Sequence, residues 1–535
     1  MIKKTIYYSG IIFIFFVYIF SFQILAGEMP DSIRVGLESV YKNAQKIDIH
    51  SETKLLVGYY ENNDFIKEGK LPSSDINVTK ASAIYYTDGL TYQTLSEAQE
   101  MASLYQDAFP AYIARNTYGV YSLIKQGAFF QVMPSSAALE VKDQYGQVIL
   151  VSDAESTPLA FQGSYSQYDF PVTGVGASRK YRGAIEIVNK GGLTPCSIVS
   201  IEDYLYGVVP AEMPSSWPEE ALKAQAVAAR SLAIFQYNRY LDRGYNVVDN
   251  TYTQVYLGVT HERPSSNNAV DATRGEVIKY NGKVAEALFF STSGGYTESA
   301  ENVWGNKVAY LNAVPDTYET SPEQKPWTRN ITLAEIDKCL AQAGANIGQA
   351  TGLEIVSRTP AGRVNELNIL GSNGVYTVKR ENVRTFFSGT NEGSLKSRMF
   401  SFDSNISVPA LASVSSSKGE GGQTLFVMSN GDLEEVSIDE LKIMSKSDIS
   451  RVSNELVVKS KDKEKIIDTK NSQGLVENNT QMQNSEVIYG DFVVYGKGYG
   501  HGVGMSQSGA KGMALAGYNY ESILKYYYQG ITVER

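Results

Sequence analysis

The chain has 535 residues, enough for two or three domains of ordinary size. Its composition is that of a globular protein, with 43% hydrophobic and 20% charged residues, and its net charge is −10. This acidic balance argues against a nucleic-acid partner, because phosphate contacts depend on lysine and arginine. Two cysteines, Cys196 and Cys339, are too few for a disulfide framework or a cysteine-rich zinc site. We expect two buried free thiols, with a single bridge as the alternative.

The first 27 residues have the pattern of a targeting segment. Lys3 and Lys4 precede an apolar run over residues 6–26, and Gly27 follows it. The run is long for a cleaved signal and barely long enough to span a bilayer. Residues 1–27 are therefore expected to be either a signal peptide or an N-terminal membrane anchor. Both alternatives place the remaining chain outside the cytoplasm.

Residues 83–123 carry a strand, helix, strand, strand pattern. Strands are expected over residues 83–86, 111–114 and 120–123, and a helix over residues 94–105. The helix is expected to be capped at Thr94 or Ser96. This order resembles a SPOR domain, a small α/β module that binds glycan strands lacking stem peptides. An unrelated structural insertion is the alternative.

The run PAEMP places an acidic side chain between two prolines. An apolar run over residues 204–209 predicts the end of a strand, and Pro210 and Pro214 then bracket Glu212. Each proline fixes its own φ and biases the preceding residue toward extended geometry. We therefore expect Glu212 to occupy a stiff, non-helical corner.

An alanine-rich helix is expected to follow this corner. Ser216 and Glu219 fit a capping box, and Pro218 falls in the first turn, where its missing N–H does no harm. The helix is expected to run to about Leu241 and to end near Gly244. Its many alanines make it thin, so that a neighbouring element can pack close.

Glu212 is a candidate general acid. Tyr204, Met213 and Trp217 are near it in sequence and could desolvate it, which would raise the pKa of its carboxyl. The N-terminus of the following helix would act in the opposite direction, because its positive end favours the anion. The residues alone leave this balance open, and a surface glutamate before a helix is the alternative.

A second motif lies at residues 291–304, after a strand that is expected over residues 284–290. Gly294 and Gly295 would let backbone N–H groups approach a ligand, and Ser291 and Thr292 add hydroxyl groups. An ordinary glycine turn is the alternative. Glu298 and Glu301 in the same stretch are reserve candidates for a second catalytic carboxyl.

From about residue 405 to residue 485 the chain becomes polar. Residues 413–422 and 462–484 have the composition of flexible segments, and residues 424–431 and 456–459 could form a small β excursion. We expect this region to be a partly ordered insertion.

A third motif, over residues 495–510, carries glycine at every second position from 496 to 504. In a strand this period would place all the glycines on one face and Lys497, Tyr499, His501 and Val503 on the other. A bare backbone face allows close contact with a neighbour or a sugar. A nucleotide-binding loop is excluded, because neither GxGxxG spacing nor a Gly-Lys-Ser/Thr run is present.

These three motifs together resemble the stage II sporulation protein D family, also called SpoIID/LytB domain proteins. The resemblance rests on residues 202–214, 221–231, 291–304 and 495–510, with a first strand at residues 33–37. It implies a larger relative with insertions rather than the sporulation protein itself. Family members resemble lytic transglycosylases, and their catalytic glutamate corresponds to Glu212. Some members bind zinc with histidine and cysteine where this chain has Phe290 and Ser293, so we expect no metal and no cofactor.

The resemblance also implies an architecture. We expect an α+β fold with a mixed or antiparallel sheet, packed helices and the small inserted module. The expected division is a start at residues 33–75, an insertion at 76–160, a catalytic core at 176–404, the polar insertion at 405–485 and the end of the core at 486–535.

The implied activity is cleavage of the bond between MurNAc and GlcNAc in peptidoglycan, with 1,6-anhydro-MurNAc ends. One carboxyl suffices, because the 6-hydroxyl of the substrate is the nucleophile, whereas hydrolysis usually needs two carboxyls. Candidate substrate-binding residues share the three motifs: Gln225, Arg230, Ser291, Thr292, Gly294, Gly295, Tyr499, His501 and Gln507. Arg230 could pair with the lactyl carboxylate of muramic acid or with a core carboxylate, and His501 outside this motif would be structural.

Two further alternatives stay open from the sequence. Some relatives are amidase enhancers, which bind the wall and stimulate a partner amidase without cleaving glycan. A purely structural wall-binding protein is a third class. Whether the biological role is sporulation or other wall remodelling, and whether stem peptides must first be removed, does not follow from the residues.

Overall fold

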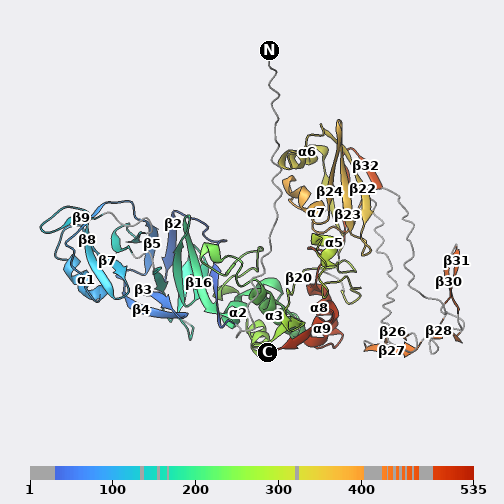
Figure 1. Cartoon of the computed structure of the whole chain (residues 1–535), viewed down its shortest axis with the longest axis horizontal. Helices are drawn as coiled ribbons and strands as arrows, with labels where there is room; N and C mark the ends of the chain where they lie inside the picture. Colours follow the sequence, from blue (N-terminus) through green and yellow to red (C-terminus); the bar gives the residue numbers. More distant parts are fainter. Residues whose placement is uncertain are drawn as a thin grey trace, which may run out of the picture. The chain divides into compact units, whose positions relative to one another are not determined.

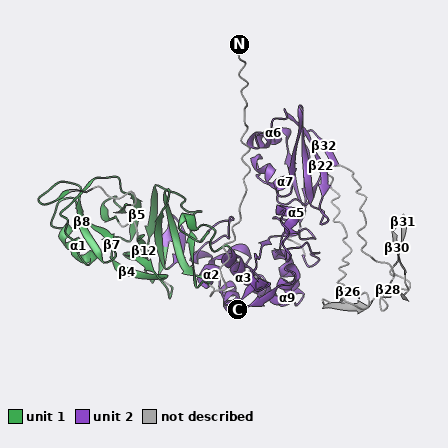
Figure 2. Cartoon of the chain, viewed as in Figure 1, with its two compact units in different colours: residues 1–173, 183–201, 236–248 green, residues 174–182, 202–235, 249–535 purple. Residues whose placement is uncertain are grey.

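The computed structural model describes residues 30–132, 138–153, 157–165, 168–319, 325–402 and 486–535, with six short strands between residues 424 and 468. The expected targeting segment, residues 1–27, lies outside the described residues. Within the described ranges no helix combines the length and the apolar character needed to cross a bilayer. The chain forms two compact units, which Figure 2 colours separately. Helices and strands both contribute, as expected for an α+β protein.

Unit 1 comprises residues 1–173, 183–201 and 236–248. Its elements are β1 (Ser32–Gly36), β2 (Lys46–His50), β3 (Leu56–Glu61), β4 (Asp64–Lys70), β5 (Asp75–Lys80), β6 (Tyr85–Thr87), α1 (Leu95–Ala102), β7 (Ala108–Ala114), β8 (Thr117–Ser122), β9 (Phe130–Val132), β10 (Leu139–Asp143), β11 (Val148–Ser152), β12 (Ala160–Gln162), β15 (Ala184–Asn189), β16 (Leu193–Ser200), the 3-10 turn η1 (Leu241–Arg243) and β17 (Val247–Val248). β13 (Val172–Val175) and β14 (Arg179–Arg182) lead the chain out of this unit.

A seven-stranded sheet in unit 1 has the order β17-β1-β16-β15-β12-β3-β4. The expected first strand is β1, which pairs antiparallel with β16 so that Ile33 faces Val199. Cys196 of β16 is free and buried, and so is Cys339 of the other unit, so neither cysteine forms a bridge. An ion pair between the partly exposed Arg34 and the buried Glu186 ties β1 to β15, which lies on the other side of β16.

The expected strand-helix-strand-strand order is present in β6, α1, β7 and β8. Thr94 caps α1 through a reciprocal capping box with Glu97, which satisfies two of the free amides at the helix start. Successive residues of β8 face opposite sides of the sheet, so Val120 packs in the cluster beside α1 and Tyr121 in the cluster with Tyr85 and Val151. The resemblance of this module to a SPOR domain stays a prediction.

Unit 2 contains the remaining described residues, with these elements: α2 (Ile201–Glu212), α3 (Glu219–Phe235), the 3-10 turn η2 (Val259–His261), α4 (Pro264–Ala272), β18 (Val277–Tyr280), β19 (Lys283–Val284), β20 (Phe289–Phe290), α5 (Ala300–Trp304), β21 (Trp327–Ile331), α6 (Leu333–Gln342), β22 (Ala350–Arg358), β23 (Val364–Gly371), β24 (Gly374–Lys379), α7 (Asn382–Thr385), the 3-10 turn η3 (Phe386–Gly389), β25 (Phe400–Ser401), β32 (Glu486–Tyr489), β33 (Phe492–Gly496), β34 (Met505–Ser506), α8 (Gln507–Leu515), α9 (Tyr520–Tyr527) and β35 (Thr532–Glu534).

The alanine-rich helix α3 is the centre of one half of unit 2. It packs against α4, α8, α9 and β18, and in Figure 1 α8 and α9 lie beside it. Buried positions extend around the whole helix from Ala221 to Ile234, and its small side chains allow this close packing. The other half has its own apolar core, built on the sheet β24-β23-β22-β32 with α6.

The polar region between residues 402 and 486 follows β25 and precedes β32, which pairs antiparallel with β22. Within it the structure describes three hairpins: β26 (Thr424–Ser429) with β27 (Asp432–Ser437), β28 (Lys442–Met444) with β29 (Ile449–Arg451), and β30 (Glu455–Ser460) with β31 (Lys463–Asp468). The expected β excursion is therefore present. The segments expected to be flexible lie outside the described residues, apart from β31.

Three local predictions around the PAEMP motif are wrong. The apolar run over residues 204–209 is helical, and α2 includes Pro210 and ends at Glu212. A short apolar run fits a buried helix as well as a buried strand. Pro210 lies in the last turn of α2, where its missing N–H removes one backbone hydrogen bond of the helix. The carbonyl of Pro218 accepts from the amide of Leu222, so Pro218 and not Ser216 occupies the N-cap position of α3.

The third error concerns where α3 ends. It stops at Phe235, where the chain passes into unit 1, and the following turn η1 ends at Gly244 in a left-handed conformation. The expected terminator is therefore present, but it closes a separate short turn.

Between Gly496 and Met505 the glycine-rich motif is not a strand. Gly498, Gly500, Gly502 and Gly504 all adopt positive φ, so the alternation reflects a repeated backbone turn and not one face of a sheet. At Gly504 a Cβ atom would lie 2.0 Å from the carbonyl oxygen of Leu288. The expected close approach of a neighbour is correct, but the neighbour is the protein's own backbone.

Replacing Gly504 by alanine is expected to destabilise unit 2, because the new Cβ meets a backbone oxygen that cannot move away. Gly517 is a matched control, since it also has positive φ but has open space around it. Both variants carry the left-handed strain of about 1–2 kcal/mol. Only Gly504→Ala adds overpacking of roughly 1–3 kcal/mol. Urea denaturation measures the difference, and equal losses for the two variants would contradict the described contact.

Candidate functional site

Glu212 is the last residue of α2, and its half-buried carboxyl faces two donors. Oε1 accepts from the amide of Val255 at 3.4 Å, and the side chain of Gln507 donates a second hydrogen bond. Burial raises the pKa of Glu212, and these two hydrogen bonds only partly oppose that effect. The position at the C-terminal end of α2 acts in the same direction as burial, because the negative end of a helix disfavours an anion. The balance that the sequence left open is thus resolved toward a raised pKa.

The side chains of Tyr204 and Met213, expected to desolvate Glu212, are both buried. Tyr204 lies close enough for the charge of Glu212 to add to burial in raising the pKa of its phenol. Its hydroxyl donates to Gln254 at 3.2 Å, and Gln254 in turn donates to the carbonyl of Ala229 in α3. This chain of hydrogen bonds fixes the position of Tyr204 near the Glu212 carboxyl.

Gln225 and Gln507 come together next to Glu212 from distant parts of the sequence. Gln507 is the first residue of α8, and its Nε2 donates to Oε1 of Gln225 on α3 at 3.4 Å. Gln225 is completely buried, whereas Gln507 keeps 6% of its surface exposed. Gln507, which also hydrogen-bonds the Glu212 carboxyl, is therefore held by Gln225.

The second and third motifs are paired along their length. β20 and β34 run parallel, with Phe290 opposite Ser506. Thr292 and Tyr499 exchange two backbone hydrogen bonds, at 3.2 and 2.8 Å. The carbonyl of Ser291 accepts from the amide of Ser508 at 3.0 Å. Together with the contact between Gln507 and Glu212, these bonds bring all three motifs to one place in unit 2.

The Ser-Gly-Gly turn does not present its amides to a ligand. The amides of Ser293 and Gly294 donate to the carboxylate of Glu319 at 2.7 and 2.8 Å, and the amide of Gly295 donates to Oγ of Ser293 at 2.9 Å. In this structure the amides of Gly294 and Gly295 are thus bound to the protein's own acceptors, and their contact with substrate stays a prediction. A buried carboxylate needs hydrogen-bond donors, and the amides of Ser293 and Gly294 supply them to Glu319.

Glu319 and Asp316 are the site residues that the sequence did not reveal. Both are buried, and Glu319 also accepts from Oγ of Ser506, the N-cap of α8, at 3.3 Å. Asp316 accepts from the hydroxyl of Tyr527 at 2.8 Å. Burial, with the charge of Glu319 next, raises the pKa of Asp316 to about 6. Neither acid belongs to a glycine or proline motif, so local sequence carried no signal for them.

His501 lies between two aromatic rings, 5.6 Å from Phe290 and 5.4 Å from Trp304, measured between centroids. Its Nδ1 accepts from the amide of Val503 at 3.0 Å. Burial, and then the charges of nearby arginines, lower the pKa of His501 to about 3. The imidazole is neutral at physiological pH and is bound to the backbone of the glycine segment, and its contact with substrate stays a prediction. Tyr499 is 54% exposed and remains accessible to a ligand.

Arg230 is buried and pairs with a core carboxylate, the second of its two expected alternatives. Nε and Nη2 bind the two carboxylate oxygens of Glu202 at 3.0 and 2.6 Å, and Nη1 binds the carbonyl of Glu276. Such a bidentate pair leaves no free edge for a substrate carboxylate.

The reserve carboxyls differ from Glu212 in their surroundings. Glu298 is fully buried and accepts from the hydroxyl of Thr359 at 2.6 Å and the amide of Ser299 at 2.9 Å. Glu301 is exposed on α5. Phe290 and Ser293 are the residues that the family resemblance places where other members would have zinc ligands. Phe290 packs against His501, and Ser293 binds Glu319. Among the described residues no group of three or more His, Cys, Asp or Glu side chains could hold a metal ion.

Comparison with known proteins identifies the segment that carries Glu212. Residues 189–280, which include α2, α3 and α4, match the family model described as "Stage II sporulation protein". The chain carries a stage II sporulation protein D domain. Residues 306–421 match a model described only as a domain of unknown function.

Three relatives of this SpoIID domain protein are informative. The "Amidase enhancer" of Bacillus subtilis is 33% identical over 337 residues, which are 62% of this chain and 40% of the relative. The "Stage II sporulation protein D" of B. subtilis is 27% identical over 353 residues, 63% of this chain and 74% of the relative. The protein of that name from Bacillus amyloliquefaciens is 34% identical over 181 residues, 31% of this chain and 52% of the relative. The chain thus spans less than half of the amidase enhancer.

Asp316→Asn is expected to become more stable relative to the wild type as the pH rises. The pKa of Asp316 is about 6 in the fold and 3.8 without burial, so the folded state holds its proton longer than the unfolded state. In the wild type the contribution of Asp316 to the free energy of unfolding decreases as the pH rises from 3.8 to about 6, by up to roughly 3 kcal/mol. The asparagine variant lacks this loss. Urea denaturation at about pH 4 and pH 7 tests it, and a stability difference from wild type that is independent of pH would contradict it.

Proposed function

We propose that this protein is a peptidoglycan lytic transglycosylase, with Glu212 as its catalytic acid and base. The observation that carries the proposal is the setting of Glu212, a half-buried carboxyl of raised pKa beside Gln507, where all three motifs meet. A general acid at neutral pH must keep its proton until it meets the substrate, and a raised pKa serves that purpose.

In the proposed reaction Glu212 first donates its proton to the oxygen between MurNAc and GlcNAc, and the C1–O bond breaks. The 6-hydroxyl of the same muramic acid then attacks C1 and returns its proton to the carboxylate. The products are a shortened glycan and a 1,6-anhydro-MurNAc end, and no water is consumed. Because the nucleophile belongs to the substrate, no second carboxyl has to position it.

The placement of the other acids supports a transglycosylase over a hydrolase. A glycosidase that activates water or forms a covalent adduct needs a second carboxylate across the substrate from the acid. Glu298, Asp316 and Glu319 are buried and bound to the protein's own donors, and Glu301 lies on α5.

A non-catalytic amidase enhancer is the second candidate function. It is favoured by the 33% identity to the protein named "Amidase enhancer". In that case the chain would bind the wall and stimulate a partner amidase, and the Glu212 carboxyl would be dispensable.

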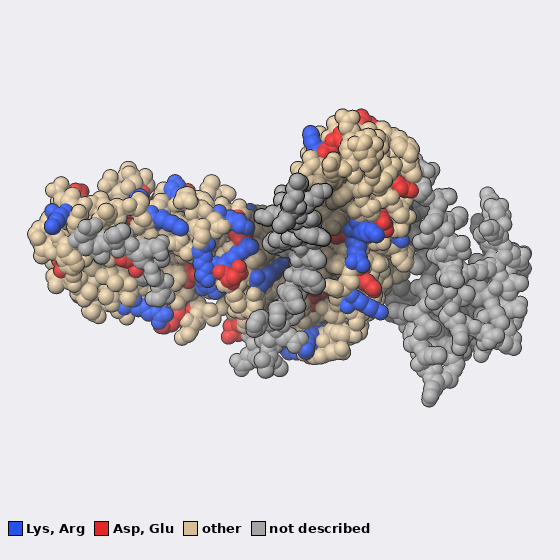
Figure 3. All heavy atoms as spheres, turned by 45° about the horizontal axis from the view of Figure 1, so that its top comes forward, with Lys and Arg blue, Asp and Glu red and all other residues tan. Residues whose placement is uncertain are grey.

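The proposal includes partners and a location. The substrate would be the glycan strand, bare or still carrying stem peptides, and a wall amidase is a candidate partner. An extracytoplasmic position follows from the pattern of residues 1–27, as a cleaved signal or as an anchor. If the module of β6, α1, β7 and β8 is a SPOR-like binder of bare glycan, it would bring the enzyme to amidase-treated wall. On the face drawn in Figure 3 acidic and basic side chains are interspersed, in keeping with a partner other than nucleic acid.

Replacing Glu212 by glutamine is expected to abolish release of fragments with 1,6-anhydro ends, by at least a hundredfold, because the amide cannot transfer a proton. Intact and peptide-stripped sacculi are digested and the products are analysed by mass spectrometry. Glu301→Gln is the matched control and should retain wild-type activity.

The outcomes separate the alternatives. Fragments with only hydrated reducing ends would rule out the transglycosylase. Loss of activity in Glu301→Gln would point to a hydrolase. If neither the wild type nor Glu212→Gln releases fragments but both stimulate an amidase equally, the protein is an enhancer.

The alkaline limit of activity is expected to depend on Gln507. The first step needs protonated Glu212, so kcat/KM falls as the pH rises through the pKa of Glu212, which burial raises and the Gln507 hydrogen bond lowers. Gln507→Leu should therefore move the alkaline limb to higher pH, whatever its effect on the maximal rate. Gln349→Leu, at an exposed glutamine, should leave the profile unchanged. A limb that moves to lower pH in Gln507→Leu would contradict this assignment.

A further inference from the structure

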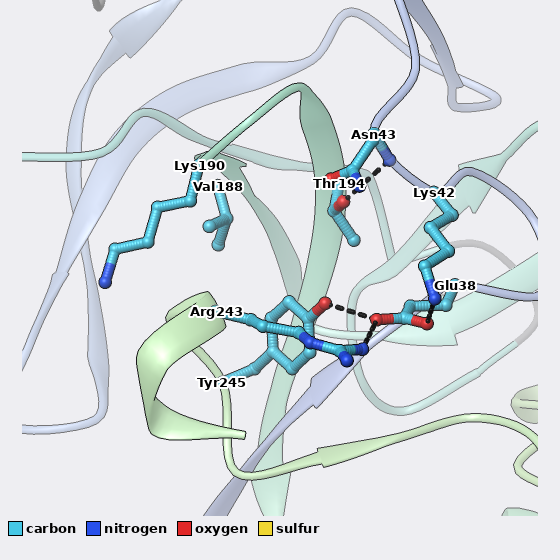
Figure 4. Close-up of a pocket in the computed structure, with 8 residues that line it drawn as sticks. All are labelled: Glu38, Lys42, Asn43, Val188, Lys190, Thr194, Arg243 and Tyr245. Carbon is cyan, nitrogen blue, oxygen red and sulfur yellow. Dashed lines mark hydrogen bonds and ion pairs between the residues drawn. The ribbon is translucent and has the colours of Figure 1, made fainter. Parts of the chain in front are cut away.

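A small cavity in unit 1 is lined by side chains from three separate segments (Figure 4). Its volume is about 190 Å³, below the range of roughly 300–1,000 Å³ typical of pockets for whole drug-sized ligands. The segment after β1, the β15–β16 hairpin, and η1 with the residues after it contribute Glu38, Lys42, Asn43, Val188, Lys190, Thr194, Arg243 and Tyr245. The cavity suits one small chemical group rather than a whole sugar.

Positive charge dominates this lining. Lys42, Lys190 and Arg243 oppose the single carboxylate of Glu38, so three positive charges and one negative leave a net charge of +2. This is a local reversal in a chain whose net charge is −10. A site of this sign attracts anions, because opposite charges close to low-dielectric walls interact strongly.

Glu38 is already saturated by the protein. Its carboxylate accepts from Nζ of Lys42 at 2.7 Å, Nη1 of Arg243 at 2.7 Å and the hydroxyl of Tyr245 at 2.6 Å. Burial alone would raise the pKa of Glu38, but these bonds together lower it, so the group stays ionised. Glu38 thus fixes the position of the two cations and leaves part of the donor capacity of each unused.

The cations are held but reachable. The Arg243 guanidinium stacks over the ring of Tyr240 at 4.6 Å, and 42% of the Arg243 side chain is exposed, as is 49% of Lys42. Arg243 has five N–H donors in a rigid fork, which match the paired oxygens of a carboxylate or a phosphate. Stacking preorganises this fork and lowers the entropy cost of binding.

We propose that this cavity binds an anionic oxygen group, the carboxylate or phosphate of a cell-wall polymer, through Arg243 and Lys42. The proposal concerns unit 1 and does not depend on the role of Glu212. Such a contact would retain the protein on its substrate polymer even where no bond is cut.

The test uses the full chain and three probes at low ionic strength: inorganic phosphate, glycerol phosphate, and a muramyl peptide that carries only carboxylates. Calorimetric titration is expected to show saturable binding of phosphate and of at least one polymer probe, weakening as salt is added. The two polymer probes tell a phosphodiester source from a peptide source.

Arg243→Met is expected to weaken binding at least tenfold, and Lys42→Met to weaken it as well. Arg239→Met is the matched control, because Arg239 also lies over the Tyr240 ring, at 5.7 Å, but does not line the cavity. Glu212→Gln should bind the probes normally, which separates this result from the proposed catalysis.

Two results would overturn the proposal. One is the lack of saturable binding of any probe by the wild type. The other is an equal loss of affinity in Arg243→Met and Arg239→Met. If Arg243→Met lowers thermal stability, the comparison uses Lys42→Met, whose substitution leaves the bonds from Arg243 and Tyr245 to Glu38 in place.

Discussion

The packing of α8 against α3 is the contact on which the site depends. It brings Gln507 to Gln225, 282 positions earlier in the chain, and to the carboxyl of Glu212. Without α8 the carboxyl would lose the hydrogen bond from Gln507 and would keep only the one from the amide of Val255. Small residues on both helices make the approach possible, since large side chains on α3 would hold α8 away.

A buried acidic pair supports α8 from the other side. Glu319 binds the Ser-Gly-Gly turn and the N-cap of α8 at once, and Asp316 binds Tyr527 of α9. Burial, and after it the charge of Glu319, raise the pKa of Asp316, and the fold tolerates this unfavourable setting. A buried carboxylate with several donors has a well-defined position. Because Glu319 binds Ser506, it also helps to fix the position of the adjacent Gln507. We interpret the second motif as a support for the Glu212 carboxyl more than as a surface for sugar.

The two units separate two kinds of chemistry. The proposed bond cleavage belongs to the helices of unit 2, whereas the cationic cavity and the strand-helix-strand-strand module belong to unit 1. Both proposed activities act on the cell wall, and an enzyme for an insoluble substrate would gain from contacts that outlast a single cleavage. The matched relatives fit either role, since one carries the name of an enhancer and two that of a sporulation protein.

The sequence by itself determined the features that depend on local chemistry. The cap of α1 at Thr94, the positions of glycine with positive φ and the choice of Glu212 as a candidate acid all follow from a few neighbouring residues. Tertiary structure decided the rest. The apolar run over residues 204–209 became a helix because it is buried among helices, and a short apolar run has no period that separates helix from strand. The partners of Arg230, Gly294 and Gln507 come from other segments of the chain, and only folding selects them.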